Sequence, residues 1–384
     1  MDTFEIRTKI HFGEGALDRL KELPGSRVLV VADPFVVQSG MVREATGRLE
    51  GAGKQVEVFD RVEPDPSVEA VAAGVAALRA WGPDTMVAMG GGSALDLAKL
   101  MREFSERVDG GVGGGRIRLV AIPTTSGTGS EVTRVAVVTD RERMTKIPLV
   151  SERLLPDEAI LDAELVKSVP PGLTADTGMD VFTHALEAYV SRHYSNFSAA
   201  MASKAMEIVG AYLLRSYLDA NDRHAREKMH AASCLAGLAF NASSLGLNHG
   251  IAHALGARFH LPHGRANALA LPHVIEYNSG IGIHSRSRPE YDHTVRCYGA
   301  IARTLGLQSL NMITTVRSLV NWVEFMMKEM DMPQRVSQAG VCGEGEYMAA
   351  VEEMAEAALG DYCTEGNPKT PTKEDVAGIL RKMW

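Results

Sequence analysis

The sequence predicts two domains, an α/β domain over residues 1–170 and an all-helical domain over residues 171–384. Three observations lead to this prediction. The chain length corresponds to two or three domains at about 150 residues each. Up to residue 160, short apolar runs alternate with helical patterns, and from Leu173 onward the strand pattern gives way to long segments of helical periodicity. We therefore expect a mostly parallel sheet wrapped by helices before Pro170-Pro171 and helices after it.

The predicted strands of the first domain are short apolar runs bounded by turn residues. Because helical segments such as Val68–Trp81 alternate with these runs, we expect both faces of the sheet to be buried. A hairpin of Val132–Val138 with Lys146–Val150 follows, and Gly110–Gly115 is predicted to be a surface loop. The predicted strands are Val28–Val31, Val56–Phe59, Thr85–Met89 and Leu119–Ile122.

The second domain is predicted to be helical from the spacing of its apolar residues. Asn311 is the expected N-cap of one helix, which Pro333 follows, and Pro262 and Gly264 indicate a helix start beside His263. The other predicted helices cover Asp176–Ser191, Ser198–Ala220, His224–Phe240, His249–Phe259 and Ile301–Leu305, and the capped helix covers Asn311–Met330.

Composition excludes several classes of function. The chain has 40 Lys and Arg against 48 Asp and Glu, a net charge of −8, and no basic run that would indicate nucleic-acid binding. It has no apolar stretch long enough for a membrane span, and its first five residues do not resemble a signal peptide. The cysteines are scattered without a Cys-x-x-Cys pair, which favours reduced thiols in the cytoplasm and excludes a thiolate zinc site. They are Cys234, Cys297, Cys342 and Cys363.

Two loops predict nucleotide binding. Gly90-Gly91-Gly92-Ser93 joins the strand ending at Met89 to a helix, and exposed N–H groups at a helix start favour a pyrophosphate. The alternative is a tight turn with Ser93 as the N-cap. The second segment, Thr124-Thr125-Ser126-Gly127-Thr128, leaves another strand and offers hydroxyls to a nucleotide. Asp33, at the end of the first strand, favours NAD over NADP unless it only caps a helix.

Aspartate and histidine at helical spacing predict a metal site. Asp180 and His184 are four residues apart, as are His249 and His253, so each pair shares one helix face, and His263 follows. Burying so many imidazoles on apolar helices without a partner would be costly. Nitrogen and carboxylate donors suit Fe(II), Zn(II), Mn(II) or Co(II).

These motifs resemble those of the iron-containing alcohol dehydrogenases. Gly90–Lys99 and Pro123–Thr133 are similar to that family's cofactor motifs, and Gly178–Tyr189 and His249–Gly256 to its metal motifs. The resemblance covers nearly the whole chain, ending in Gly366-Asn367-Pro368. Within the family, the chain resembles the 1-propanol dehydrogenases of bacterial propanediol-utilisation microcompartments.

The resemblance implies a dehydroquinate synthase-like fold with the site in a cleft between an NAD-binding domain and a helical metal-binding, catalytic domain. It implies Asp180, His184, His249 and His263 as metal ligands, and His253 as a catalytic residue beside the nicotinamide. Phe240 would line the substrate pocket, and Asp33 would select NAD. The implied cofactor-binding residues are Gly91, Gly92, Ser93, Thr124, Thr125, Thr128 and Lys146.

The implied function is a metal-dependent NAD(H) alcohol dehydrogenase for a short-chain aldehyde and alcohol, with propionaldehyde and 1-propanol as the expected pair. Its cofactors would be NAD(H) and Fe²⁺, with Zn²⁺ as an alternative. Lactaldehyde, 1,3-propanediol or other small alcohols are alternative substrates, and a dehydroquinate synthase-like lyase is an alternative activity. We further expect a homo-oligomer, a dimer or larger, in the cytoplasm or inside a microcompartment with its shell or core proteins as partners.

Overall fold

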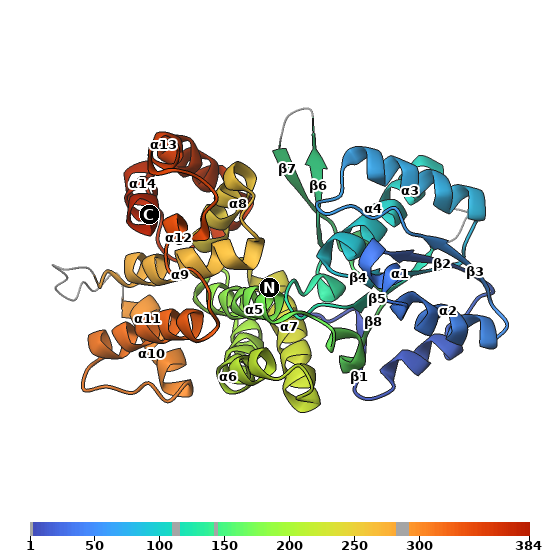
Figure 1. Cartoon of the computed structure of the whole chain (residues 1–384), viewed down its shortest axis with the longest axis horizontal. Coiled ribbons are helices and arrows are strands. Elements are labelled where there is room, and N and C mark those ends of the chain that lie inside the picture. The colour runs from blue at the N-terminus through green and yellow to red at the C-terminus, as the bar shows by residue number, and fades with distance from the viewer. Residues whose placement is uncertain (1–2, 110–115, 142–144, 282–291) are drawn as a thin grey trace. The chain divides into compact units, whose positions relative to one another are not determined.

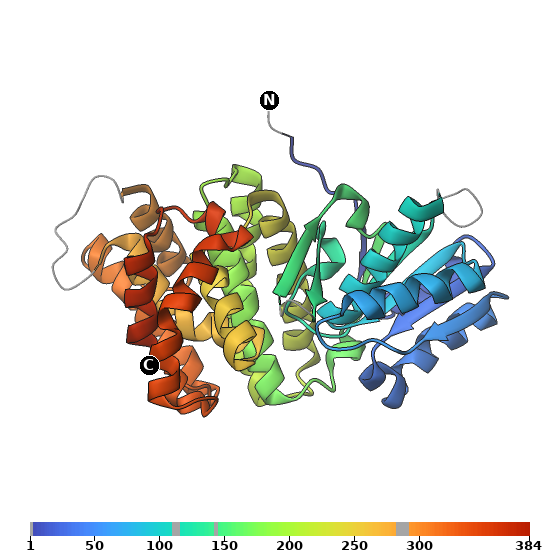
Figure 2. The same cartoon turned by 90° about the horizontal axis from the view of Figure 1, so that it is seen from above.

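The computed structural model describes residues 3–109, 116–141, 145–281 and 292–384, so the predicted loop Gly110–Gly115 lies outside the described residues. The chain divides into two compact units, Met1–Ser168 and Val169–Trp384. Figures 1 and 2 show a sheet flanked by helices in the first unit and helices throughout the second, which confirms the predicted fold class.

Within its described residues, the first unit has one six-stranded parallel sheet in the order β1-β8-β5-β4-β2-β3. All the strands predicted for the sheet are present, at β2 to β5. The sequence did not predict β1 and β8, and β8 begins with a buried charge, Glu158, that interrupts the apolar pattern. Arg19 and Arg118 pair with that carboxylate at 2.8 and 2.9 Å. The strands are β1 (Lys9–Phe12), β2 (Arg27–Ala32), β3 (Gln55–Phe59), β4 (Thr85–Gly90), β5 (Arg118–Pro123) and β8 (Glu158–Leu161).

Helices bury both faces of this sheet. Leu29 and Val31 of β2 pack with residues of α3 (Val68–Trp81) and α4 (Gly92–Asp109). Val28 and Val30 belong to the core on the opposite face, together with residues of α2 (Met41–Gly51). Alternation along the strand is what lets one continuous apolar run fill two cores. The remaining helical segments are α1 (Pro34–Gln38), η1 (Ala16–Glu22), η3 (Ser130–Val132), η4 (Glu152–Leu154) and η5 (Ala163–Val166).

The predicted hairpin is also present. Strands β6 (Val135–Asp140) and β7 (Thr145–Val150) pair antiparallel as a separate two-stranded sheet. β6 begins three residues later than predicted because Ser130–Val132 turns in a short 3-10 helix.

The second unit is helical through its described residues. Helix α5 begins at Pro171, before the predicted Asp176, because Pro171 takes the first helical position, where its missing N–H costs no hydrogen bond. The longer helices are α5 (Pro171–Val190), α6 (Asn196–Leu218), α7 (Arg223–Ser243), α8 (Leu247–Phe259), α9 (His263–Ser279), α10 (Asp292–Thr304), α11 (Met312–Glu329), α13 (Glu344–Gly360) and α14 (Lys373–Met383), with α12 (Val336–Ala339) and η7 (Tyr362–Gly366) between them. No helix in the described ranges is both long and apolar enough to cross a membrane.

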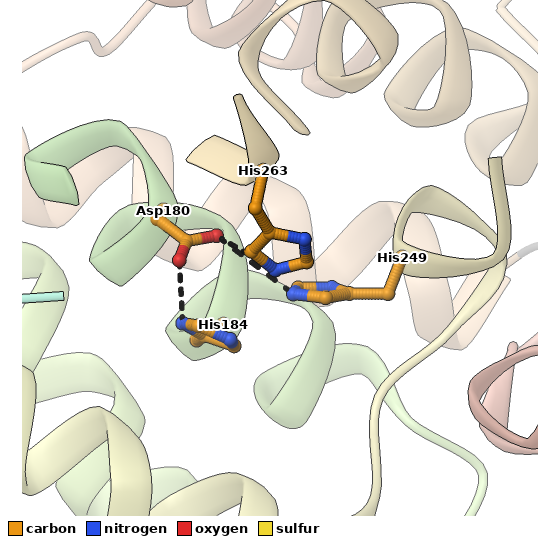
Figure 3. A group of neighbouring side chains, drawn as sticks. All are labelled: Asp180, His184, His249 and His263. Carbon is orange, nitrogen blue, oxygen red and sulfur yellow. Dashed lines mark ion pairs between the residues drawn. The ribbon is translucent and has the colours of Figure 1, made fainter. Parts of the chain in front are cut away.

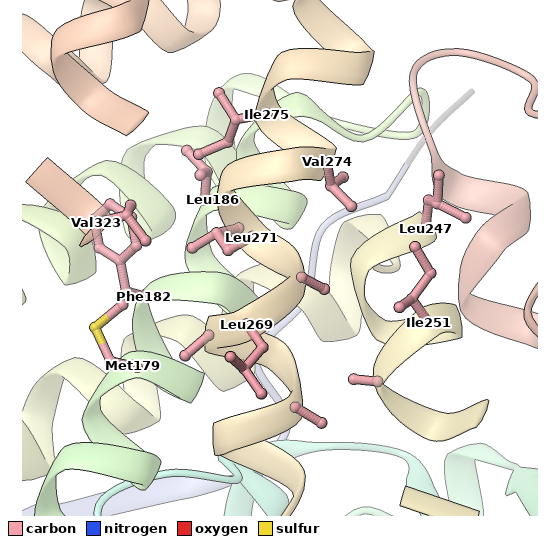
Figure 4. Packing of buried hydrophobic residues seen from close by; sticks show 14 of the residues in the cluster. Met179, Phe182, Leu186, Leu247, Ile251, Leu269, Leu271, Val274, Ile275 and Val323 are labelled. Atoms are coloured by element: carbon pink, nitrogen blue, oxygen red, sulfur yellow. The ribbon is translucent and has the colours of Figure 1, made fainter. Parts of the chain in front are cut away.

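A single apolar cluster holds α5, α8 and α9 together (Figure 4). Phe182 of α5 is fully buried and its ring lies 4.8 Å from that of Trp322 on α11. Leu269 and Leu271 of α9 and Ile251 of α8 join the same cluster. Close packing of these three helices fixes the positions of the polar side chains that they carry.

Candidate metal and nucleotide sites

Three helices bring the predicted metal ligands to one point (Figure 3). Asp180 and His184 lie one turn apart on α5, His249 lies near the start of α8, and His263 is the first residue of α9. One donor atom from each side chain lies within 4.8 Å of the others. The charged oxygen atoms of Asp180 lie 3.9 Å from His184 Nδ1, 3.9 Å from His249 Nε2 and 3.5 Å from His263 Nε2.

These separations fit a divalent metal. Bonds of about 2.0–2.2 Å place ligand atoms about 3–4.4 Å from one another. The amide of Asn267 supports the fit, because its Nδ2 donates to Asp180 Oδ1 at 2.7 Å and lies 3.2 Å from His249 Nε2 and 3.1 Å from His263 Nε2. One donor group at this distance from three acceptors shows that their lone pairs converge, as ligation of one cation requires.

Burial shifts the pKa values of the predicted metal ligands. Asp180, His184 and His249 are buried, whereas the His263 side chain is 41% exposed and leaves the group open on one side. Burial raises the pKa of Asp180 above its ordinary value, and burial with neighbouring imidazoles lowers the pKa of His249 well below it. The neutral form of His249 is therefore favoured, which is the form that binds a metal.

Glu187 is a functional residue that the sequence analysis missed. Its Oε2 lies 2.5 Å from His249 Nδ1, so the carboxylate and imidazole share a proton on that nitrogen and Nε2 faces the other ligands. The same carboxylate accepts from the backbone N–H of Asn248 at 2.7 Å, at the start of α8. Burial raises the pKa of Glu187 to about 8. The available signal was its spacing, three residues after His184 and seven after Asp180, which places it on the same helix face.

The structure also brings His253 and Phe240 to this group. The ring of Phe240 stacks on His184 with centroids 4.7 Å apart. His253 stacks on His263 at 5.3 Å, and its Nδ1 lies 2.8 Å from Asp361 Oδ2. Asp361 was not predicted, because no spacing pattern connects it with α8. The other two histidines of the 249–273 segment lie outside the group of four ligands, His260 as the left-handed C-cap of α8 and His273 inside α9.

In the first unit, the two predicted nucleotide loops follow the carboxyl ends of β4 and β5, and Asp33 follows that of β2. These three strands are adjacent in the sheet. A Cβ on Gly92 would lie 2.9 Å from Thr128 Cγ2, and a Cβ on Gly91 would touch Thr125 at 3.8 Å. The backbone N–H of Thr124 donates to Gly90 O at 3.0 Å. The glycine turn and the hydroxyl loop therefore lie side by side at one edge of the sheet, where ligands bind in open α/β sheets.

Asp33 lies at the same edge and is a helix cap as well. Its Oδ1 accepts from Val36 N–H at 2.9 Å at the start of α1, and its Oδ2 accepts from Gly91 N–H at 3.4 Å. Helix capping was the alternative role for Asp33 in the sequence analysis. Asp33 does cap α1, and its carboxylate also contacts the glycine turn. Ser93 is not an N-cap, because α4 begins at Gly92, and its Oγ accepts from Asp65 N–H at 3.3 Å.

Lys99 of α4 anchors the short helix η3, which follows the hydroxyl loop, a role that the sequence analysis missed. Its fully buried ammonium donates to Ser130 Oγ at 2.7 Å and to Val135 O at 2.9 Å. Asp96 accepts from the same Ser130 hydroxyl at 2.6 Å. Burial lowers the pKa of Lys99 to about 8. Lys146 lies on β7, and its side chain is outside the described part of the structure.

Comparison with known proteins identifies the family. Residues 7–163 match the model for iron-containing alcohol dehydrogenase, and residues 174–384 match the C-terminal model of the Fe-containing alcohol dehydrogenase family. The chain is 39% identical to 1-propanol dehydrogenase PduQ of Salmonella typhimurium, over 100% of both chains. It is 38% identical to NADPH-dependent butanol dehydrogenase of Clostridium saccharobutylicum, over 100% of this chain and 98% of the other. An iron-containing alcohol dehydrogenase structure from Thermococcus thioreducens matches with a TM-score of 0.88 and 33% identity over 99% of both chains.

The chain belongs to the iron-containing alcohol dehydrogenase family. The predicted family, fold and enzyme class, an iron-containing alcohol dehydrogenase, are confirmed by these matches. Membership implies iron and a nicotinamide nucleotide as cofactors, and the donor set of Asp180, His184, His249 and His263 suits such a metal.

We expect Gly264→Ala to disrupt the ligand group. The added Cβ would lie 2.0 Å from Asp176 O, and this atom belongs to the backbone of α5, which cannot rotate away. The first turn of α9 would move and carry His263 with it. The free energy of unfolding should fall by about 1–3 kcal/mol, as overpacking typically costs, and metal affinity should fall at least about tenfold.

Chemical denaturation and elemental analysis after dialysis would measure both effects. Gly256→Ala is the matched control, because its added Cβ would lie at an ordinary 3.5 Å from Leu261 O. Normal metal content and stability in Gly264→Ala would show that the α5–α9 contact does not set the ligand geometry.

Proposed function

We propose that the chain interconverts a short-chain aldehyde and its primary alcohol with NAD(H) and a divalent metal, Fe²⁺ or alternatively Zn²⁺, and that propionaldehyde and 1-propanol are its substrate pair. The observation that carries the proposal is the convergence of one carboxylate and three imidazoles on one point that is open at His263. The 39% identity to a 1-propanol dehydrogenase supports the substrate pair.

The metal would be held by Asp180, His184, His249 and His263, and when bound it supplies a Lewis acid for the carbonyl oxygen. The chain's own contribution is preorganisation. Glu187 holds His249 with Nε2 toward the other ligands, and Asn267 orients Asp180. Phe240, stacked on His184, gives the group an apolar neighbour suited to a short alkyl chain.

His253 would move the proton that the reaction requires. The pKa of Asp361 is held below its ordinary value by its hydrogen bond to His253, so this carboxylate is ionised and acts as the acceptor. The proton of the imidazole then resides on Nδ1, and Nε2 is left to exchange a proton with substrate or water.

The cofactor would be held by the glycine turn and the hydroxyl loop. Gly91, Gly92 and Ser93 would bind the pyrophosphate at the start of α4, and Thr124, Thr125, Thr128 and Lys146 would contact the nucleotide. Asp33 supports NAD over NADP, because a carboxylate accepts from a ribose hydroxyl and repels a 2′-phosphate.

A dehydroquinate synthase-like lyase is the less favoured activity. It would bind a polyanionic sugar acid, for which several Lys or Arg are needed. Arg258 and Arg265 lie among the histidines in the sequence, and each has an acidic partner. Arg265 forms two hydrogen bonds to Asp176 at 3.1 and 3.0 Å, and Arg258 lies 3.8 Å from Glu346.

The first test is loss of the metal. We expect Asp180→Ala and His263→Ala each to lose the metal and to lower turnover by about 1,000-fold or more, because several kcal/mol of charge stabilisation would be absent. Elemental analysis and NADH oxidation with propionaldehyde measure the two effects, and His260→Ala is the control within the same segment. Retained turnover in protein without metal would refute the proposal.

The second test concerns the substrate. Initial rates of the Fe(II)-loaded enzyme with acetaldehyde, propionaldehyde, butyraldehyde and lactaldehyde should give the highest kcat/KM for propionaldehyde. A pocket of fixed size discriminates about 10–200-fold per methylene. A higher value for butyraldehyde or lactaldehyde would replace the proposed pair and leave the class of reaction intact.

The third test concerns the cofactor. Asp33→Asn removes the charge while keeping a residue that caps helices. We expect the ratio of kcat/KM for NADPH to that for NADH to rise by about tenfold, equivalent to 1.4 kcal/mol of relieved repulsion. Asp222→Asn, which neutralises the N-cap of α7, is the charge-matched control. An unchanged ratio would remove Asp33 from cofactor selection.

The homo-oligomer and the association with a microcompartment stay predictions that rest on the family resemblance. The cytoplasmic location stays a prediction that rests on the scattered cysteines.

A further inference from the structure

A second group of metal-ligating side chains lies beside the first. It consists of His253 on α8 and Asp361 and Cys363 at the start of η7, and one donor atom from each lies within 4.8 Å of the others. Within this group, His253 Nδ1 lies 2.8 Å from Asp361 Oδ2. The cysteines form no Cys-x-x-Cys pair along the chain, but here one thiol meets ligands from another element of the fold.

Backbone contacts fix the two elements that carry this group. A Cβ on Gly250 of α8 would lie 2.2 Å from Thr364 Oγ1 and 2.7 Å from Ala358 O, so only glycine permits this approach. Thr364 Oγ1 donates to Ala358 O at 2.6 Å and holds η7 against the end of α13. His253, one turn after Gly250, is thereby held against η7.

Asp361 is positioned from within η7. Its Oδ1 accepts from Cys363 N–H at 2.8 Å, which leaves Oδ2 for His253. Cys363 Sγ lies within 4.8 Å of an Asp361 carboxylate oxygen, so the carboxylate is close to both other members of the group. The three donors are therefore held by backbone and side-chain contacts and do not depend on mobile surface residues.

The electrostatics favour a cation at this position. Burial and the neighbouring Asp361 and Glu187 carboxylates raise the pKa of the Cys363 thiol well above its ordinary value, so the thiol keeps its proton at neutral pH. Coordination to a divalent ion would remove the proton of the thiol, because a coordinating thiol is deprotonated outright. The His253 side chain is 36% exposed, which leaves room for a water ligand.

We propose that His253 Nδ1, an Asp361 carboxylate oxygen and Cys363 Sγ form a second site for a thiophilic divalent cation such as Zn²⁺, distinct from the group of Asp180, His184, His249 and His263. Binding forms three metal–ligand bonds and releases one proton, that of the thiol. The imidazole stays neutral, because its proton moves through water from Nδ1 to Nε2 when Nδ1 binds the cation. Zinc–ligand distances of about 2.0–2.3 Å require the donors to adjust by about 1 Å or less.

Occupation of this site would inhibit the enzyme. His253 lies between the two groups, with ring centroids 5.3 Å from His263 and 5.9 Å from His249. With Nδ1 bound to a cation, the imidazole loses the hydrogen bond to Asp361 that orients it for proton transfer. This consequence, unlike the site itself, rests on the role proposed above for His253.

Cadmium is the probe that separates the two sites, because the first group contains no sulfur. Titration of the iron-loaded full chain with CdCl₂ under anaerobic conditions should produce the ultraviolet charge-transfer band of a cadmium thiolate. Cys363→Ser should abolish the band, and Asp361→Asn should weaken cadmium binding by about 10–100-fold. Cys342→Ser, the matched control, should retain it.

Absence of the band in the unchanged protein, its persistence in Cys363→Ser, or its loss in Cys342→Ser would each overturn the site. His263→Ala should keep the band, so failure of the proposed first metal site would not affect this result. Zinc added in excess should inhibit the unchanged enzyme at lower concentration than Cys363→Ser, by at least about tenfold. Equal inhibition would overturn the inhibitory role.

Discussion

The desolvation of Asp180 is the constraint on which the second unit depends. A carboxylate removed from water is costly unless positive charge or hydrogen-bond donors surround it. Here the surroundings come from three helices, as His184 on α5, His249 on α8, and His263 and Asn267 on α9. The apolar cluster around Phe182 keeps these helices together, so packing and the polar group support one another. A cation at the centre would compensate for the burial most completely, and the family's iron fits this requirement.

Glycine makes the required approach of the helices possible. At Gly264 a side chain would meet the backbone of α5, and at Gly250 it would meet η7 and the end of α13. At Gly246, a Cβ would lie 2.7 Å from Glu187 Oε1, the carboxylate that orients His249. Each of these glycines therefore lies where a polar side chain from another element is brought into place. The ligand geometry is consequently a property of backbone contacts as much as of the ligands.

In the first unit, parallel strands bring segments that are distant in the sequence to one edge of the sheet. Because β2, β4 and β5 are adjacent and run in the same direction, the residues that follow them meet at one edge of the sheet. Asp33, the Gly91 turn and the Thr124 loop are far apart in sequence but are brought together there. The buried ammonium of Lys99 donates to Ser130, just after the hydroxyl loop. The proposed nucleotide site and the candidate metal site thus lie in separate units, each with its own core.

The sequence by itself determined the fold class, the strands β2 to β5, most helices and the metal-ligand candidates, because apolar periodicity and the spacing of four residues are local properties. It did not predict β8, where a buried Glu158 relies on Arg19 and Arg118 from other elements. Nor did it identify Glu187, Asn267, Asp361 or Cys363 as members of the sites. Their roles arise from contacts between segments, such as His253 with Asp361, that have no repeating signature in the chain. Only the tertiary structure decided which polar residues support the ligands, because that depends on how closely the helices pack.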